Sequence, residues 1–127
     1  MNKVLLAALV AANAALAATA LVARAAPAAA QSTGAQLFGQ CAACHSTDGT
    51  NGLGPTLKGI LGRESASVPG FAFSGAMKRA HLRWTAEQLD AYIANPQAVV
   101  PGNAMPYAGM TDGEQRAALI AYLATLK

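Results

Sequence analysis

The chain has 127 residues, enough for one small domain, and its hydrophobic content of 54% is raised by an alanine-rich N-terminal stretch. The formal charge is +3, but residues 31–127 carry seven basic against six acidic side chains and no basic run. This near-neutral balance argues against nucleic acid as a partner and against a strongly basic docking face.

Residues 1–30 have the composition of a secretory signal peptide, with a positive start, an uncharged run over residues 4–23 and small residues that fit the cleavage rule. We expect cleavage between Ala25 and Ala30, which would leave a domain of residues 31–127. The uncharged run is also 20 residues long, enough to span a bilayer, so an uncleaved membrane anchor is an alternative. In both cases we expect the domain in the periplasm.

The first helix of the domain leads into the cysteines. Ser32 and Thr33 are suitable N-caps for a short helix that runs through Leu37 and Phe38. Gly34 is a weak helix former unless another backbone approaches closely, so its place in this helix suggests a helix crossing.

The segment Cys41-Ala42-Ala43-Cys44-His45 holds both cysteines and one of the two histidines. Cys-x-x-Cys-His is the attachment signature of a c-type haem, in which two thiols add to the porphyrin vinyl groups and the imidazole binds the iron. A thioredoxin-like redox pair, half of a zinc site and a short disulfide are the alternatives. The redox pair requires a βαβ pattern, which is not found, and a zinc site would have only His81 as a further strong ligand.

An irregular loop with five glycines and one proline runs from Ser46 to Gly62, and long loops of this kind usually wrap around something, here a haem edge. An iron-bound histidine normally donates its other N–H to an acceptor. A carbonyl of Gly54-Pro55-Thr56-Leu57 could accept it, although a plain turn proline is the alternative.

The sequence of residues 68–84 predicts little regular structure. Residues 68–73 are expected to be extended or loop-like, and Ser74 can cap a brief helix over residues 75–80. His81 lies in a polar stretch and is expected to be a solvated surface residue. Trp84 has an indole N–H that would need an acceptor, such as a propionate, beside a buried porphyrin.

Thr85-Ala86-Glu87-Gln88 has the form of a capping box and predicts a helix to about Ala94, which ends at Asn95-Pro96. Pro96 can open another short helix through Ala98. The expected core face of the first of these helices comprises Leu89, Tyr92 and Ile93.

Thr111-Asp112-Gly113-Glu114 is a second capping box and predicts a last helix to about Leu126. Ala118 and Ala121 on this helix can admit a crossing helix, and Gly34 is the expected partner. No sheet is evident, so the fold class should be all-α.

Met105 lies in a loop stiffened by Pro101 and Pro106, which can hold a thioether towards a metal at little entropic cost. Core filling is the ordinary role of a methionine. With a haem histidine in place, Met105 becomes the favoured second iron ligand, and Met110 and Met77 are the alternatives.

Together these residues resemble a class I cytochrome c of the soluble bacterial type, and the resemblance covers nearly the whole of 33–127. The resemblance implies a small all-α fold of about four to five helices with long loops around one covalently bound haem c. The matching pieces are, in chain order, Gly34-x-x-x-Phe38-x-x-Cys41-x-x-Cys44-His45, Gly54-Pro55-x-Leu57-x-Gly59, Gly62-Arg63, Trp84, Leu89-x-x-Tyr92-x-x-Asn95-Pro96, Pro101-Gly102-x-x-Met105 and Leu119-Ile120-x-Tyr122-Leu123.

The resemblance also implies a set of cofactor-binding residues. They are Cys41 and Cys44 for the thioether bonds, His45 and Met105 as axial iron ligands, Pro55 as acceptor for the His45 ring, Arg63 and Trp84 at a propionate, and Tyr92 near the Met105 sulfur. The chain departs from the mitochondrial-like pattern at Phe73, where tyrosine is common, and at Met77, where asparagine is common. Ala104 stands where a lysine often precedes the ligand methionine.

The function implied is that of an electron carrier and not of an enzyme. Iron closed by His45 and Met105 has no vacant position for a substrate, and methionine ligation raises its potential. We expect a monomer that docks briefly with redox proteins, such as a membrane oxidoreductase complex, an oxidase or a periplasmic dehydrogenase, with no small-molecule substrate. A small haem enzyme or a gas-binding sensor with a displaceable methionine is the alternative, and a non-haem cysteine redox or zinc domain is a more distant one.

Overall fold

The structure, a computed structural model, describes residues 28–127. The expected signal peptide over residues 1–30 therefore lies almost entirely outside the described residues. The described part is mostly helical and contains no strand, and a single isolated antiparallel bridge joins Glu64 and Arg83. The all-α prediction is confirmed. None of the helices in this part has the length and apolar character that a membrane crossing needs.

The described chain begins in a helix over residues 28–37, which passes into a short 3-10 turn, η1 (Phe38–Gln40). The prediction that Ser32 or Thr33 caps this helix is wrong. Both hydroxyls donate to the carbonyl of Ala29, at 2.8 and 3.1 Å, so they satisfy a carbonyl one turn earlier within the helix.

Helix α2 (Gly75–Ala80) begins where the sequence predicts, because the Ser74 hydroxyl accepts the Met77 N–H. His81 ends the helix in a left-handed conformation with φ of 47° and is exposed to solvent, as expected for a surface residue.

Helices α3 (Ala86–Ala94) and α4 (Pro96–Val99) also match the prediction. Thr85 accepts the Gln88 N–H at the start of α3. Asn95 both ends α3 and caps α4, where its side chain accepts the Ala98 N–H at 3.1 Å. One residue therefore sets the sharp turn between the two helices, and proline follows it at the first position of α4.

Helix α5 (Gly113–Leu123) differs from the prediction at both ends. Its N-cap is Asp112 and not Thr111, because the Asp112 carboxylate accepts the N–H groups of Glu114 and Gln115. The helix ends at Leu123 instead of near Leu126, and tighter turns with hydrogen bonds to the third preceding carbonyl follow it.

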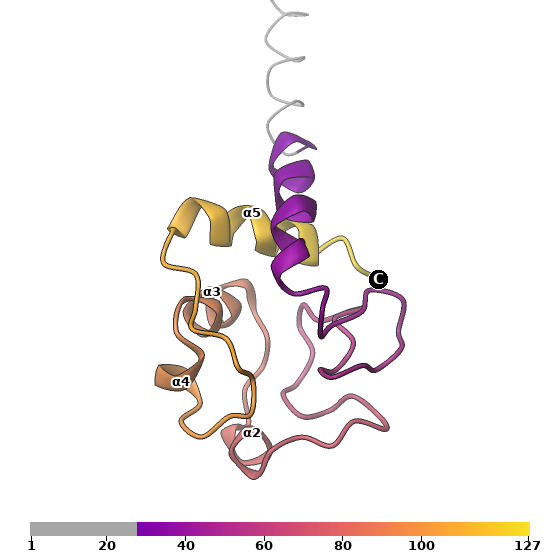
Figure 1. Cartoon of the computed structure of the whole chain (residues 1–127), viewed down its shortest axis with the longest axis vertical. Coiled ribbons are helices and arrows are strands. Elements are labelled where there is room, and N and C mark those ends of the chain that lie inside the picture. The colour runs from indigo at the N-terminus through magenta and orange to yellow at the C-terminus, as the bar shows by residue number, and fades with distance from the viewer. Residues whose placement is uncertain (1–27) are drawn as a thin grey trace, which may run out of the picture.

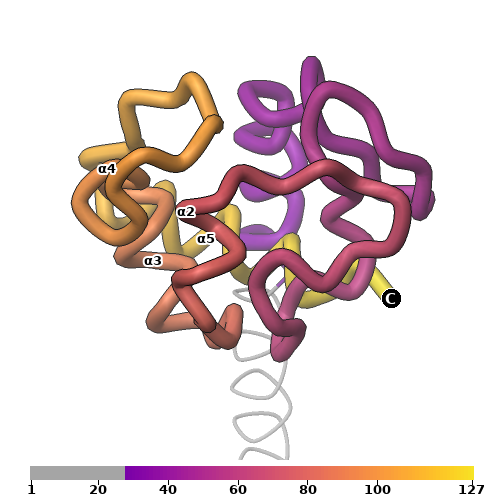
Figure 2. Tube along the Cα trace, turned by 90° about the horizontal axis from the view of Figure 1, so that it is seen from below, coloured from indigo at the N-terminus to yellow at the C-terminus, as the bar shows by residue number. Residues whose placement is uncertain are grey.

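The helices enclose one core. The N-terminal helix crosses α5 in Figure 1, and Gly34 lies in this crossing, as the sequence predicts. Helix α3 packs against both α5 and α4. Figure 1 shows the short helix α2 at the end of the molecule opposite the N-terminal helix, and in Figure 2, which is seen from that end, α2 and the loop before it cross the front of the molecule. The buried core residues are Phe38, Ile60, Trp84, Leu89, Tyr92, Val100, Met110, Leu119, Ile120 and Leu123.

Candidate haem site

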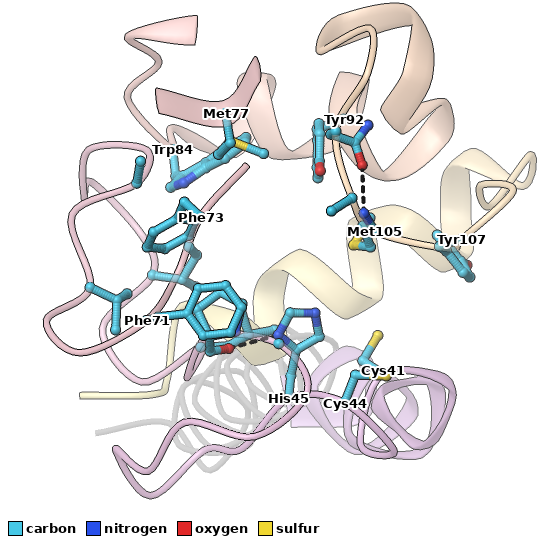
Figure 3. A pocket seen from close by; sticks show the side chains of 18 of the residues that line it. Cys41, Cys44, His45, Phe71, Phe73, Met77, Trp84, Tyr92, Met105 and Tyr107 are labelled. Carbon is cyan, nitrogen blue, oxygen red and sulfur yellow. Dashed lines mark hydrogen bonds between the residues drawn. The ribbon is translucent and has the colours of Figure 1, made fainter. Parts of the chain in front are cut away.

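A cavity of about 550 Å³ lies between the helices and the peripheral loops. This volume falls within the range of roughly 300–1,000 Å³ that is usual for pockets that bury a small molecule. Its walls are mostly apolar, and Figure 3 shows their side chains arranged around a central space. All of the cofactor-binding residues expected from the sequence line it: Cys41, Cys44, His45, Pro55, Arg63, Trp84, Tyr92 and Met105.

The two cysteines are presented by a tight turn at the end of η1. The Phe38 carbonyl accepts the N–H of Cys41 at 2.8 Å, and the Cys41 carbonyl accepts the N–H groups of Cys44 and His45 at 3.1 and 2.9 Å. Both thiols are free. Burial, and secondarily the neighbouring Cys44, raises the pKa of the Cys41 thiol. A reactive redox cysteine needs the opposite shift, so this environment disfavours a thioredoxin-like pair.

The His45 ring is fixed from behind by the loop that follows it. Its Nδ1–H donates to the Pro55 carbonyl at 2.7 Å, which leaves Nε2 to face the cavity. Gly54 lies directly against the ring, and a Cβ at this position would come within 2.6 Å of the His45 Cε1 atom. The glycine therefore allows the backbone to approach the imidazole closely enough for the hydrogen bond.

The backbone around Pro55 is itself held by side chains. The Arg63 guanidinium donates through Nη2 to the Thr56 carbonyl at 2.9 Å and through Nη1 to the Lys58 carbonyl at 2.8 Å. On the other side, the Asn51 carboxamide oxygen accepts the Thr56 N–H at 3.1 Å. These contacts give the acceptor of the His45 ring a defined position.

Arg63 also has an unused donor. Its Nε–H is buried and has no hydrogen-bond partner among residues 28–127, and no acidic side chain pairs with it there. Burial lowers the pKa of this guanidinium, which reflects the cost of keeping its charge away from water. A half-buried cation with a buried free donor at the wall of an apolar cavity fits an anionic group such as a haem propionate.

Met105 lies across the cavity from His45, and the two side chains enter it from opposite sides in Figure 3. The two alternative ligands, Met110 and Met77, differ in their relation to the cavity. Met110 is 5% exposed, belongs to the core and does not line the cavity, and its N–H donates to the Ile93 carbonyl at 2.9 Å. Met77 does line it, from helix α2.

Aromatic side chains form much of the remaining wall. Trp84 and Tyr92 are buried and their ring centroids are 5.0 Å apart. Burial raises the pKa of Tyr92 to about 12, so its hydroxyl stays neutral. Phe73 lies in the wall beside Phe71, at an edge-on centroid distance of 4.8 Å, and cannot donate a hydrogen bond where a tyrosine could.

A zinc site has no support in this part of the chain. Across residues 28–127 no group of three or more histidine, cysteine, aspartate or glutamate side chains could hold a metal ion. His81, the only further strong ligand in the sequence, lies outside the cavity. The groups that do line one apolar space are two thiols, an imidazole, a thioether and a half-buried guanidinium, and this set fits a covalently attached haem.

Several polar residues that shape the site were not predicted from the sequence. Asn103 is buried at the cavity wall, and its carboxamide oxygen accepts the Met105 N–H at 2.9 Å. Tyr107 donates from its hydroxyl to the Gln40 side chain at 3.3 Å, which connects the methionine loop to the turn before Cys41. The Pro-Gly-Asn turn was visible in the sequence, but the direction of the Asn103 side chain was not.

Comparisons with known proteins point to one family. The family model described as "Cytochrome c" matches residues 31–127. The chain is 49% identical over 86 residues to a "Cytochrome c-type cyt cy" of Rhodobacter capsulatus, covering 68% of this chain and only 43% of that protein. It is 44% identical over 107 residues to a cytochrome c2 of Blastochloris viridis, covering 81% and 84% of the two chains. The solved structure of cytochrome cH from Methylobacterium extorquens has a TM-score of 0.72 at 39% identity, covering 74% of this chain and 96% of that one.

Proposed function

The chain belongs to the cytochrome c family, and from this we propose that it carries single electrons between redox partners by means of one covalently bound haem c. The observation that carries the proposal is that His45 and Met105 enter one apolar cavity from opposite sides. If both residues ligate the haem iron, they would leave no position on it for a substrate.

Cys41 and Cys44, which line the cavity, would hold the haem through thioether bonds. When bound, the haem supplies reversible gain and loss of one electron at its iron, at a potential raised by methionine ligation. His45 needs a fixed ring orientation for this, and the hydrogen bond to the Pro55 carbonyl supports it by making Nδ1 the donor and Nε2 the free nitrogen.

The remaining walls of the cavity would balance the charge of a propionate and exclude water from the haem. The free Nε–H of Arg63 would pair with a propionate, which would otherwise be a costly buried anion. Trp84, Tyr92 and the other apolar side chains keep water away from the rest of the cavity. A dry and rigid cavity limits how far the surrounding dipoles must rearrange each time the haem iron gains or loses an electron.

The proposed carrier works outside the cytoplasmic membrane. The signal-peptide composition of residues 1–30 supports export to the periplasm, with a retained anchor over residues 4–23 as the alternative. Its partners would be other redox proteins, met briefly as a monomer at the rim of the cavity through a small interface.

A potentiometric titration followed by visible spectroscopy tests the proposal. The haem-loaded protein should reduce and re-oxidise reversibly in one single-electron step, with both forms low-spin, and it should not turn over hydrogen peroxide. Catalytic consumption of peroxide, or a high-spin form in either redox state, would favour a haem enzyme or sensor instead.

A further inference from the structure

Asn103 is one of two buried polar side chains in the described part of the chain, with 7% of its surface exposed. Its carboxamide N–H groups donate to the carbonyls of Pro96 and Val100, at 3.0 and 2.9 Å. Its carboxamide oxygen accepts the backbone N–H of Met105 at 2.9 Å. Both donors and the acceptor are thus in use, and they connect α4 to the residue that faces His45 across the cavity.

The segment over residues 104–109 has few other hydrogen-bonded supports. Within the described chain it makes two hydrogen bonds to residues outside itself, the one from Met105 to Asn103 and the one from the Tyr107 hydroxyl to Gln40. The second is long, at 3.3 Å, and joins two side chains near the surface. The backbone of Met105 is therefore fixed chiefly by the Asn103 side chain.

The backbone of the turn at Asn103 has further hydrogen bonds, none of which involves the Asn103 side chain or Met105. The Gln97 carboxamide donates to the Asn103 carbonyl at 3.2 Å and accepts the Gly102 N–H at 3.0 Å. Gly102 has a φ of 80°, which allows the chain to turn back so that the next side chain points inward. The turn before Met105 is thus a closed set of hydrogen bonds with Asn103 at its centre.

We propose that Asn103 is the positioning residue for the methionine ligand: its carboxamide holds the Met105 backbone so that the thioether stays directed at the iron. The proposal rests on the ligand role of Met105 in the proposed function. A thioether is a weak ligand, so the fraction of molecules in which an external ligand can replace it depends on how firmly the protein holds the segment.

Binding of imidazole to the oxidised, haem-loaded protein measures this fraction directly. Asn103→Ala leaves the Met105 N–H without a partner and removes one of the two donors from each of the Pro96 and Val100 carbonyls, which keep their backbone hydrogen bonds. Imidazole should then bind at least about tenfold more tightly than to the unchanged protein. Asn103→Ser provides a second variant in case the alanine variant does not fold, because its hydroxyl can accept the Met105 N–H, and its imidazole affinity should lie between the two.

Gln97→Ala is the matched control. It removes two hydrogen bonds from the same turn but none to Met105, so it should lower the resistance to urea while changing imidazole affinity by less than about threefold. If Asn103→Ala and Asn103→Ser bind imidazole no more tightly than Gln97→Ala, Asn103 has only a structural role and the inference is wrong.

Met105→Ala separates this inference from the proposed function. If Met105→Ala binds imidazole much more tightly than the unchanged protein while the Asn103 variants do not, Met105 is the ligand and only the role of Asn103 fails. If Met105→Ala leaves imidazole affinity unchanged, Met105 is not the ligand and the proposed function fails with it.

Discussion

Gly34 of the N-terminal helix lies directly against the backbone carbonyl of Ala118 in α5. A Cβ at Gly34 would overlap that carbonyl oxygen and would come within 2.7 Å of the Cβ of Tyr122. The two helices can therefore cross at this distance only because residue 34 has no side chain. This crossing positions the turn that carries Cys41 against the C-terminal helix.

Gly34→Ala should lower the free energy of unfolding of the haem-loaded protein by about 1–3 kcal/mol, because the added methyl group must push the helices apart. Gly39→Ala is the control, since a Cβ there meets nothing within 4 Å. Urea unfolding followed by tryptophan fluorescence measures both. If the two variants were equally stable, the close crossing would not contribute to stability.

The crossing of Gly34 with Ala118 was accessible from the sequence, because a glycine inside one helix and small residues on another are typical of a close approach between the two. The caps at Ser74 and Thr85 were accessible for a similar reason, since each depends on residues three positions apart in the sequence, whereas Asn95 was predicted only as the end of a helix. Local rules of this kind explain why most helix starts were placed correctly.

The sequence was less informative where several local arrangements compete. Thr111 and Asp112 can both cap a helix, and the carboxylate, which accepts two N–H groups, is the cap in the structure. The hydroxyls of Ser32 and Thr33 can either cap a helix start or donate to a carbonyl within a helix. The second occurs here, because the helix already includes residues 28–31. Asn103 reads as an ordinary turn residue until its side chain is seen to point inward, because that direction depends on α4 and the loop together.

Arg63 should affect both the stability of the protein and the reduction potential of the haem. Arg63→Lys keeps the charge but loses the two-pronged contact with the Thr56 and Lys58 carbonyls, so it should destabilise the protein by about 1–3 kcal/mol. Arg63→Gln also removes the positive charge and should lower the reduction potential, because a nearby cation favours the reduced iron.

Protein-film voltammetry and urea unfolding on the same samples check this pair. Arg79→Gln is the control for charge, since Arg79 is exposed on α2 and does not line the cavity. A potential that falls as far in Arg79→Gln as in Arg63→Gln would show that Arg63 has no special relation to the haem.

Electron exchange between two copies of the protein should depend little on salt, because the exposed residues that line the cavity, its rim, carry almost no net charge. The rim includes Leu53, which is 84% exposed, and Glu64, which is paired with Arg83. Because the rim carries almost no net charge, the self-exchange rate of the protein, measured by NMR, should change by less than about threefold between low and high ionic strength. The exposed lining residues are Gln40, Leu53, Glu64, Ala72, Ala104 and Pro106.

Leu53→Lys offers a direct comparison. Two copies of this variant would bring like charges together at the rim, so self-exchange should slow at low salt and recover as salt is added. A strong salt dependence in the unchanged protein, or none in Leu53→Lys, would mean that electrons leave through another part of the surface.

Met105→Leu and Met110→Leu test the choice of ligand with the same substitution at both sites. Met105→Leu should lower the reduction potential markedly and allow carbon monoxide to bind the reduced protein, because leucine has no sulfur to offer. Met110→Leu changes a core residue at nearly constant volume and should cost less than about 1.5 kcal/mol with no change in ligand binding. The reverse pattern would move the ligand to Met110.

The visible spectrum of the purified protein in the presence of carbon monoxide tests the central claim most directly. Protein from a host that exports it and attaches haem should be red, should keep its haem through acid-acetone extraction, and should give a low-spin reduced spectrum that carbon monoxide leaves unchanged. A colourless protein would contradict haem attachment at Cys41 and Cys44. A red protein whose spectrum shifts with carbon monoxide would contradict the closed site formed by His45 and Met105.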